Sequence, residues 1–150
     1  MGGQYPSGHE YNFVKYNATA AAHVVNTWPG CITFCGVEIG DVVLSGGNFT
    51  VRAPEKDPVK AAYQWFIGKG NPNGSWDPLT VLYAIQGLGN VFEYGEDGYN
   101  YVYPNGTNEW QNTTREDAHH RFLKLQMSPS EAGAILDELF LQGAMAASRH

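Results

Sequence analysis

The sequence has few basic residues, little cysteine and no long apolar run, and each shortage excludes a class of protein. Lys and Arg number 9 against 15 Asp and Glu, for a net charge of -6, and the basic residues form no block. A phosphate backbone is bound by clustered cations, so we expect no nucleic-acid partner. No apolar run approaches the roughly 20 residues of a transmembrane helix, so we expect no membrane partner.

The cysteines are too few and badly spaced for a disulfide framework. Cys31 and Cys35 lie four residues apart in a predicted strand, which separates them by about 13 Å. A disulfide cannot form at that distance without a bend in the chain. We therefore expect two free, buried thiols.

Apolar residues and glycosylation motifs are abundant. The 150 residues are 43% hydrophobic and 13% aromatic, which predicts a single folded domain over residues 1–150 rather than a disordered chain. Acceptor motifs of the form Asn-x-Ser/Thr begin at Asn17, Asn48, Asn73, Asn105 and Asn112. This excess predicts a secreted, extracellular glycoprotein, although a composition rich in Asn and Gly also raises the number of such motifs.

The first part of the chain has the pattern of an α/β protein. Asn17 can cap a helix through about Thr27, and the apolar run Cys31–Ile39 is typical of a strand covered on both faces. Asp57-Pro58 and Asp77-Pro78 each predict the start of a further helix. The predicted buried residues of these helices are Ala20, Ala21, Val24 and Val25, then Val59, Ala62, Tyr63, Phe66 and Ile67, then Leu79, Leu82, Tyr83 and Ile85.

The second part has short aromatic alternations followed by one strong helix signal. Residues 90–125 contain several alternating segments joined by turn residues, which predicts a small antiparallel β meander. Ser128-Pro129-Ser130-Glu131 is a capping box with proline at the first helical position. We expect a C-terminal helix to about Ala146 that buries Ile135, Leu136, Leu139 and Phe140.

The segment Gly2–Phe13 has the composition of a binding loop. Its glycines allow close approach of the backbone to a ligand, and Glu10 and Asn12 point the same way if the segment is extended. One side of the loop then carries a carboxylate and an amide, which together can bind sugar hydroxyls.

At these residues the chain resembles the inosine-uridine preferring nucleoside hydrolases. Met1-Gly2-Gly3 followed by Glu10-Tyr11-Asn12 is similar to the family's strand end and loop, and Trp76-Asp77-Pro78 stands where the family has His-Asp-Pro. The resemblance covers the C-terminal half of the family's domain and lacks its Asp-rich cluster. It implies a partial nucleoside-hydrolase-like sheet with flanking helices, to which the meander and the C-terminal helix are added.

The resemblance also implies roles for individual residues. The family hydrolyses the N-glycosidic bond of ribonucleosides with the help of calcium. By position, Glu10 and Asn12 would bind the ribose and Asp77 would be a calcium ligand. Trp76 replaces the family's acid His; an indole can stack on a base or sugar but cannot protonate a leaving group. Calcium needs six to eight oxygens, so we expect weak or no calcium binding, no catalytic residue and no hydrolysis by this chain alone.

Each of these roles has a purely structural alternative. Asp77 can be a helix N-cap, as Asp57 is predicted to be, and Glu10 and Asn12 can stabilise a solvated strand end. His119 and His120 are adjacent, so in a strand they face opposite sides and cannot jointly bind a metal.

A second reading is a secreted, non-catalytic, lectin-like carbohydrate-binding protein. It rests on the Tyr, Trp and Asn residues between Tyr99 and Trp110, which can form a sugar-binding surface or simply pack the meander. Both readings predict a homo-oligomer, because half of an α/β domain exposes a strand edge and an apolar face that a partner must cover.

Overall fold

Three helices begin where the sequence places a capping residue. In the computed structural model, which describes residues 1–113, 115–116 and 119–148, Asn17 caps α2 (Ala18–Thr27) and Asp57 caps α5 (Pro58–Ile67). Their side chains accept hydrogen bonds from the backbone N–H groups of Ala20 and Lys60 at 2.9 and 2.8 Å. The capping box of Ser128 and Glu131 starts α7 (Pro129–Ala147), so all three predicted starts are confirmed.

Four other helices differ from the prediction in existence or in bounds. They are α1 (Tyr11–Val14), α3 (Val37–Val42), α4 (Gly47–Arg52) and α6 (Trp76–Gln86). The chain turns at Gly36 to begin α3, so the predicted strand over Cys31–Ile39 was wrong beyond Phe34. The helix predicted to start after Asp77 begins earlier, with Ser75 as its N-cap.

The strands are short and form three small sheets. Their bounds are β1 (Ser7–Gly8), β2 (Cys31–Phe34), β3 (Leu44–Ser45), β4 (Asn73–Gly74), β5 (Phe92–Tyr94), β6 (Tyr99–Val102), β7 (Asn108–Gln111) and β8 (His119–Leu125). The strand orders are β1-β7-β6, β2-β8-β5 and β3-β4. In the second sheet, β8 pairs parallel with β2 and antiparallel with β5.

This pairing corrects the predicted meander. Strands were expected near the positions of β5 to β8, but of these four, as far as the structure describes them, only β6 and β7 pair as consecutive neighbours. Strand β5 pairs with β8 and not with β6, which follows it in the sequence. Strand β8 also pairs with β2, which lies far earlier in the chain. The fold is therefore mixed α/β, with helices packed around small sheets rather than on one continuous sheet.

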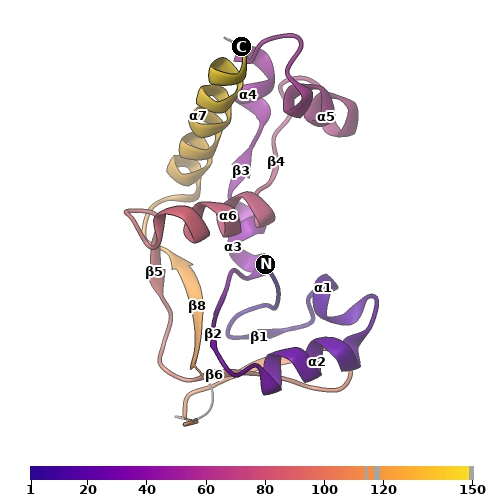
Figure 1. The fold of residues 1–150 in the computed structure, drawn as a ribbon, viewed down its shortest axis with the longest axis vertical. Helices are drawn as coiled ribbons and strands as arrows, with labels where there is room; N and C mark the ends of the chain where they lie inside the picture. The colour runs from indigo at the N-terminus through magenta and orange to yellow at the C-terminus, as the bar shows by residue number, and fades with distance from the viewer. Residues whose placement is uncertain (114, 117–118, 149–150) are drawn as a thin grey trace.

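The molecule is elongated, with three hydrophobic clusters along its length (Figure 1). One end holds α1, α2 and the β1-β7-β6 sheet around Tyr5, Val102 and Trp110. The middle is packed by side chains of α3, α6, β5 and β8, with Leu79 and Phe92 at its centre. At the other end Phe49 of α4 packs against α7.

Several side chains lie on the opposite side of their helix from the prediction. Val24 of α2 is 50% exposed, whereas Ala22 and Val25 are buried. In α5 most of the predicted apolar face is outside, since Phe66 is 70% exposed while Lys60 is the buried residue. Tyr63 and Ile67 of that face are half-buried, and Tyr63 packs against Phe49 of α4. The remaining corrections are to Ala20, Val59, Ala62, Ile85 and Leu139, which are exposed.

The two cysteines differ in their exposure. Both cysteines are free, as predicted, but only Cys35 is buried, because Cys31 begins β2 at the surface.

Among the described residues, no helix combines the length and the apolar character that crossing a bilayer requires.

Candidate functional site

The four residues that the sequence singled out line one cavity of about 320 Å³. Glu10 and Asn12 come from the start of the chain, and Trp76 and Asp77 come from the first turn of α6. The remaining wall is formed by Met1, Tyr11 and Val37. Residues more than sixty positions apart in the sequence therefore meet at one small concave surface.

Glu10 is fixed by the backbone around it. Its side chain is only 3% exposed, and its two carboxylate oxygens accept hydrogen bonds from the backbone N–H groups of Asn12 and Gly3 at 2.9 and 3.1 Å. Glu10 is thus the N-cap of α1, and Asn12 lies inside that helix. The condition of an extended segment is therefore not met at Asn12, because the chain enters a helix directly after Glu10.

The side chains of Glu10 and Asn12 each keep hydrogen-bonding capacity for a ligand. A carboxylate oxygen has a second lone pair after it has accepted one hydrogen bond, so Glu10 can still accept from a hydroxyl group. The exposed Asn12 amide donates to the sulfur of Met1 at 3.0 Å. It retains a second N–H and its carbonyl oxygen for a ligand.

The Trp76 indole is held in place on several sides. Its Nε1 donates to the Asp41 carboxylate at 2.7 Å, so the ring's hydrogen-bond donor is already used. Gly40 and Gly74 make room for the ring; a Cβ on Gly74 would lie 2.6 Å from its Cη2. The ring therefore offers a fixed aromatic surface for stacking and no proton.

Asp77 has the free carboxylate of the site. It is the second residue of α6 and not its N-cap, so the capping alternative for this residue was wrong. Among the described residues, no hydrogen bond or ion pair engages its exposed side chain. It lies next to the cavity in the first turn of α6, where the end of the helix favours negative charge.

The donor set does not fit a calcium ion. Calcium takes six to eight oxygens, and each Glu10 carboxylate oxygen already accepts one hydrogen bond from a backbone N–H group. This leaves the Asp77 carboxylate and the Asn12 carbonyl as uncommitted side-chain oxygens.

A second cavity adjoins the first through shared residues. It measures about 420 Å³, and Trp76 and Asp77 belong to its lining as well as to that of the Glu10 cavity. Its other side is formed by Tyr63 and Phe66 of α5. Sequence reasoning missed these two aromatic residues as site residues, because their helical spacing predicted core packing.

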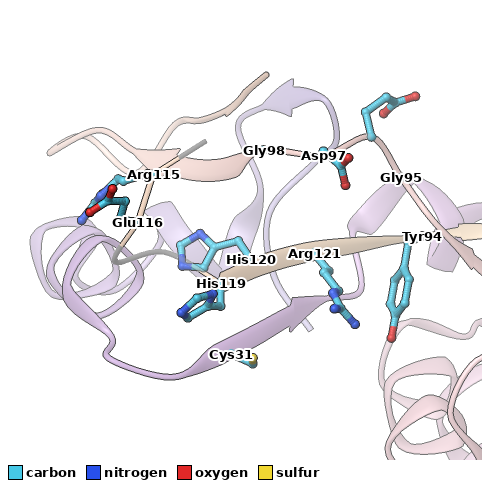
Figure 2. A pocket seen from close by; sticks show the side chains of 11 residues that line it. Cys31, Tyr94, Gly95, Asp97, Gly98, Arg115, Glu116, His119, His120 and Arg121 are labelled. Atoms are coloured by element: carbon cyan, nitrogen blue, oxygen red, sulfur yellow. The ribbon is translucent and has the colours of Figure 1, made fainter. Parts of the chain in front are cut away.

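A further cavity lies at the start of β8. It measures about 530 Å³ and is lined by residues of both charge signs, among them Arg121, Asp97 and Glu116 (Figure 2). His119 is exposed, but His120 is buried and its Nδ1 accepts a hydrogen bond from the backbone N–H of Asn100. The burial of the two residues alternates along the strand, yet both imidazoles belong to the lining of this one cavity.

The surface proposed for carbohydrate binding is only partly available. Trp110 and the side chains of Asn100 and Asn108 are buried, the last two joined by a hydrogen bond of 3.1 Å. Tyr101 and Tyr103 remain nearer the surface, with ring centroids 5.0 Å apart.

Comparison of the chain with protein-family models, with curated protein sequences and with solved structures gives no match.

Proposed function

We propose that this protein binds a ribonucleoside, with the ribose in the Glu10 cavity and the base in the aromatic cavity next to it. The observation that carries the proposal is that Trp76 and Asp77 line both cavities. A ligand with a polar ring joined to a flat aromatic ring matches two adjoining spaces of these two characters. The resemblance to nucleoside hydrolases at Glu10, Asn12 and Asp77 supports the same assignment.

The chemistry of each cavity suits one half of such a ligand. In the ribose half, Glu10 and Asp77 accept hydrogen bonds from sugar hydroxyls, and the Asn12 amide can donate or accept. In the base half, Tyr63, Phe66 and Trp76 provide aromatic surface for stacking. Asp77 lies at the junction, where it can reach the hydroxyls nearest the glycosidic bond.

The same residues favour binding without hydrolysis. Cleavage of a ribosyl bond needs an activated water and a group that assists departure of the base. The Trp76 indole donates to Asp41 and cannot transfer a proton. Burial raises the pKa of Tyr63, so its phenol stays protonated near neutral pH and is a poor acid. We therefore propose a nucleoside-hydrolase-like binding protein that does not catalyse the family's reaction on its own.

Calorimetric titration tests the binding proposal. Inosine or uridine is expected to bind more tightly than ribose or the free base, because each half of the ligand fills one cavity. Asp77→Asn removes a charge-assisted hydrogen bond worth about 1.5–3 kcal/mol and should weaken nucleoside binding roughly tenfold or more. Asp97→Asn, a matched change at an exposed site lining the distant cavity, should leave binding unchanged.

Two results would contradict the proposal. If the Asp77→Asn variant and the unmodified protein bound inosine or uridine with equal affinity, Asp77 would not contact the ribose. Release of free ribose at enzymatic rates from inosine or uridine, with calcium present, would show that the chain is catalytic after all.

The carbohydrate-binding alternative rests on the Tyr101 and Tyr103 pair. Tyr103 is 39% exposed, and its hydroxyl donates to Glu109 at 2.8 Å, which orients the ring at the surface. A glycan array distinguishes the two functions: binding to oligosaccharides that is lost in Tyr103→Ala and kept in Asp77→Asn favours this alternative.

A further inference from the structure

The base cavity of the proposed nucleoside site has one polar side chain to which the proposed function gives no role. This is Asn73 of β4, which lines the cavity of about 420 Å³ together with Tyr63 and Phe66 of α5 and Trp76 of α6. The Asn73 residue is half-buried, and no hydrogen bond joins its side-chain amide to another described residue. Both the carbonyl oxygen and the NH₂ group of this amide are therefore available to a ligand.

The other polar side chains of the cavity already have partners or a role. Trp76 Nε1 donates to a carboxylate at 2.7 Å, and the Tyr63 phenol has the Ser45 hydroxyl as a hydrogen-bond partner. Asp77 is shared with the Glu10 cavity, and the proposed function assigns it to the sugar. Among the described lining residues, Asn73 is thus the group that remains for the edge of a base.

Asn73 has a defined position because the backbone of β4 is held in place. Asn73 pairs with Ser45 of β3. Two residues further on, Ser75 Oγ lies 2.7 Å from Ser45 Oγ, and the Ser75 backbone N–H donates to the Gly40 carbonyl at 2.9 Å. Both serine side chains are fully buried. Since β4 leads directly into α6 (Figure 1), one short segment positions both the Asn73 amide and the Trp76 ring.

A carboxamide recognises a particular pattern on the edge of a base. Its oxygen accepts one hydrogen bond and its NH₂ group donates another, so it pairs with an edge that has an N–H donor beside an acceptor. Asn and Gln form such paired contacts with adenine in protein–DNA complexes. Hypoxanthine, with N1–H and O6, and uracil, with N3–H and O4, have the same pattern. The six-membered ring of unsubstituted purine has acceptors but no N–H donor.

We propose that Asn73 selects the base by pairing with an edge that carries an N–H donor beside an acceptor, while the aromatic residues of the cavity contact the ring. The inference rests on the proposed nucleoside-binding function and adds the class of base that the site takes. The described lining of the cavity contains no Lys or Arg, which suits a neutral base. Aromatic contacts alone accept any flat ring, whereas a base without the donor leaves the Asn73 oxygen unpaired.

Calorimetric titration with inosine and purine riboside tests this role. The two ligands share the ribose, and they differ in the N1–H and O6 of the base. The unmodified protein should bind inosine about fivefold to tenfold more tightly than purine riboside, which is the effect of one neutral hydrogen bond. In Asn73→Ala the ratio of the two affinities should fall to roughly twofold or less, because the paired contact is absent. Circular dichroism checks that the variant is folded.

Asn48→Ala is the matched control. Asn48 is exposed on α4 and belongs to the lining of neither of the two cavities. The same chemical change at this position should therefore keep the full preference for inosine over purine riboside.

The possible results separate this inference from the function on which it rests. If neither inosine nor purine riboside binds the unmodified protein, the nucleoside-binding function fails and the role of Asn73 fails with it. If both ligands bind with equal affinity, the nucleoside-binding function stands and selection by Asn73 is overturned. Selection by Asn73 is also overturned if Asn73→Ala keeps the preference for inosine.

Discussion

At the scale of single residues, one buried and one half-buried carboxylate organise the start of the chain. Glu10 binds the backbone N–H groups of Gly3 and Asn12, and Glu38 accepts a hydrogen bond from the backbone N–H of Tyr5 at 3.1 Å. The Gly2–Phe13 loop is therefore held from both sides by side chains that are not part of a regular sheet. This explains how a glycine-rich segment can present Glu10 and Asn12 in a defined position.

Glu38 should make stability depend on pH in an unusual direction. Burial raises the pKa of Glu38, and the nearby Asp41 raises it too, although hydrogen bonds from the backbone of Glu38 itself and of Tyr5 act the other way. The folded state thus favours the protonated form more than the unfolded state does. The contribution of Glu38 is most favourable below the pKa of the unfolded state and is lost as pH rises through the higher pKa of the folded state.

Replacement of Glu38 by Gln provides the measurement. The difference in free energy of unfolding between the unmodified protein and Glu38→Gln should shift in favour of the unmodified protein as pH falls through this window. Urea denaturation at a series of pH values from weakly acidic to neutral measures it. A difference that shifts the opposite way would mean that the hydrogen bond from Tyr5 outweighs burial.

At the scale of elements, local capping signals were predictable and packing direction was not. Asn17, Asp57 and Ser128 start helices through their own side chains, so three or four consecutive residues contain the whole signal. Which side of α5 is covered depends instead on α4, a neighbour that the sequence did not predict. The partners of β8 could not be inferred either, because the turn residues around it do not specify a parallel pairing with β2.

The site was predictable to a similar degree. The loop and α6 each carried recognisable residues, and these do line one cavity. Tyr63 and Phe66 were not recognised, because an aromatic residue at helical spacing has the same pattern whether it faces the core or a ligand. The structure distinguishes a core residue from a ligand-facing one, because Phe66 is 70% exposed, and the sequence does not contain this exposure.

The capping box of α7 gives an element-scale prediction. Ser128 Oγ accepts from the Glu131 backbone N–H at 3.3 Å, and the Glu131 carboxylate accepts in return from Ser128. Ser128→Ala should lower the free energy of unfolding by about 1 kcal/mol, the usual effect of losing an N-cap. Ser130→Ala, in the same turn and exposed, is the control for helix propensity and should be close to neutral. Equal effects of the two substitutions in chemical denaturation would contradict a capping role.

At the scale of the whole molecule, α7 joins the central cluster to the far end of the chain. Leu136 packs in the middle cluster and Leu141 packs with Phe49 of α4. Between them, Asp137 of α7 accepts hydrogen bonds from the backbone N–H groups of Gly46 and Asn48 at the start of α4. Gly46 has a φ of 94° and provides no side-chain cap, so this carboxylate caps α4 from a different helix.

Asp137→Asn should therefore loosen the end of the molecule that contains α4. An amide has one acceptor oxygen in place of two, so one backbone N–H loses its partner, at a cost of about 1–3 kcal/mol. Hydrogen exchange should show faster exchange in α4 than in β8. Glu138→Gln removes an exposed ion pair with Arg52 and should change the free energy of unfolding by about 1 kcal/mol or less. Uniformly faster exchange over the entire chain would argue against a local role.

The parallel pairing of β2 with β8 has a consequence for biosynthesis. Strand β2 (Cys31–Phe34) can pair only after residues 119–122 of β8 have been synthesised. The hydrogen bond from the Gln4 backbone to Asn108 similarly joins residues 104 positions apart. Such distant contacts slow folding, because the intervening chain must be closed into a large loop first. A nascent chain therefore carries an unpaired β2 until residues 119–122 have been synthesised, and an unpaired strand edge of this kind can pair with another chain.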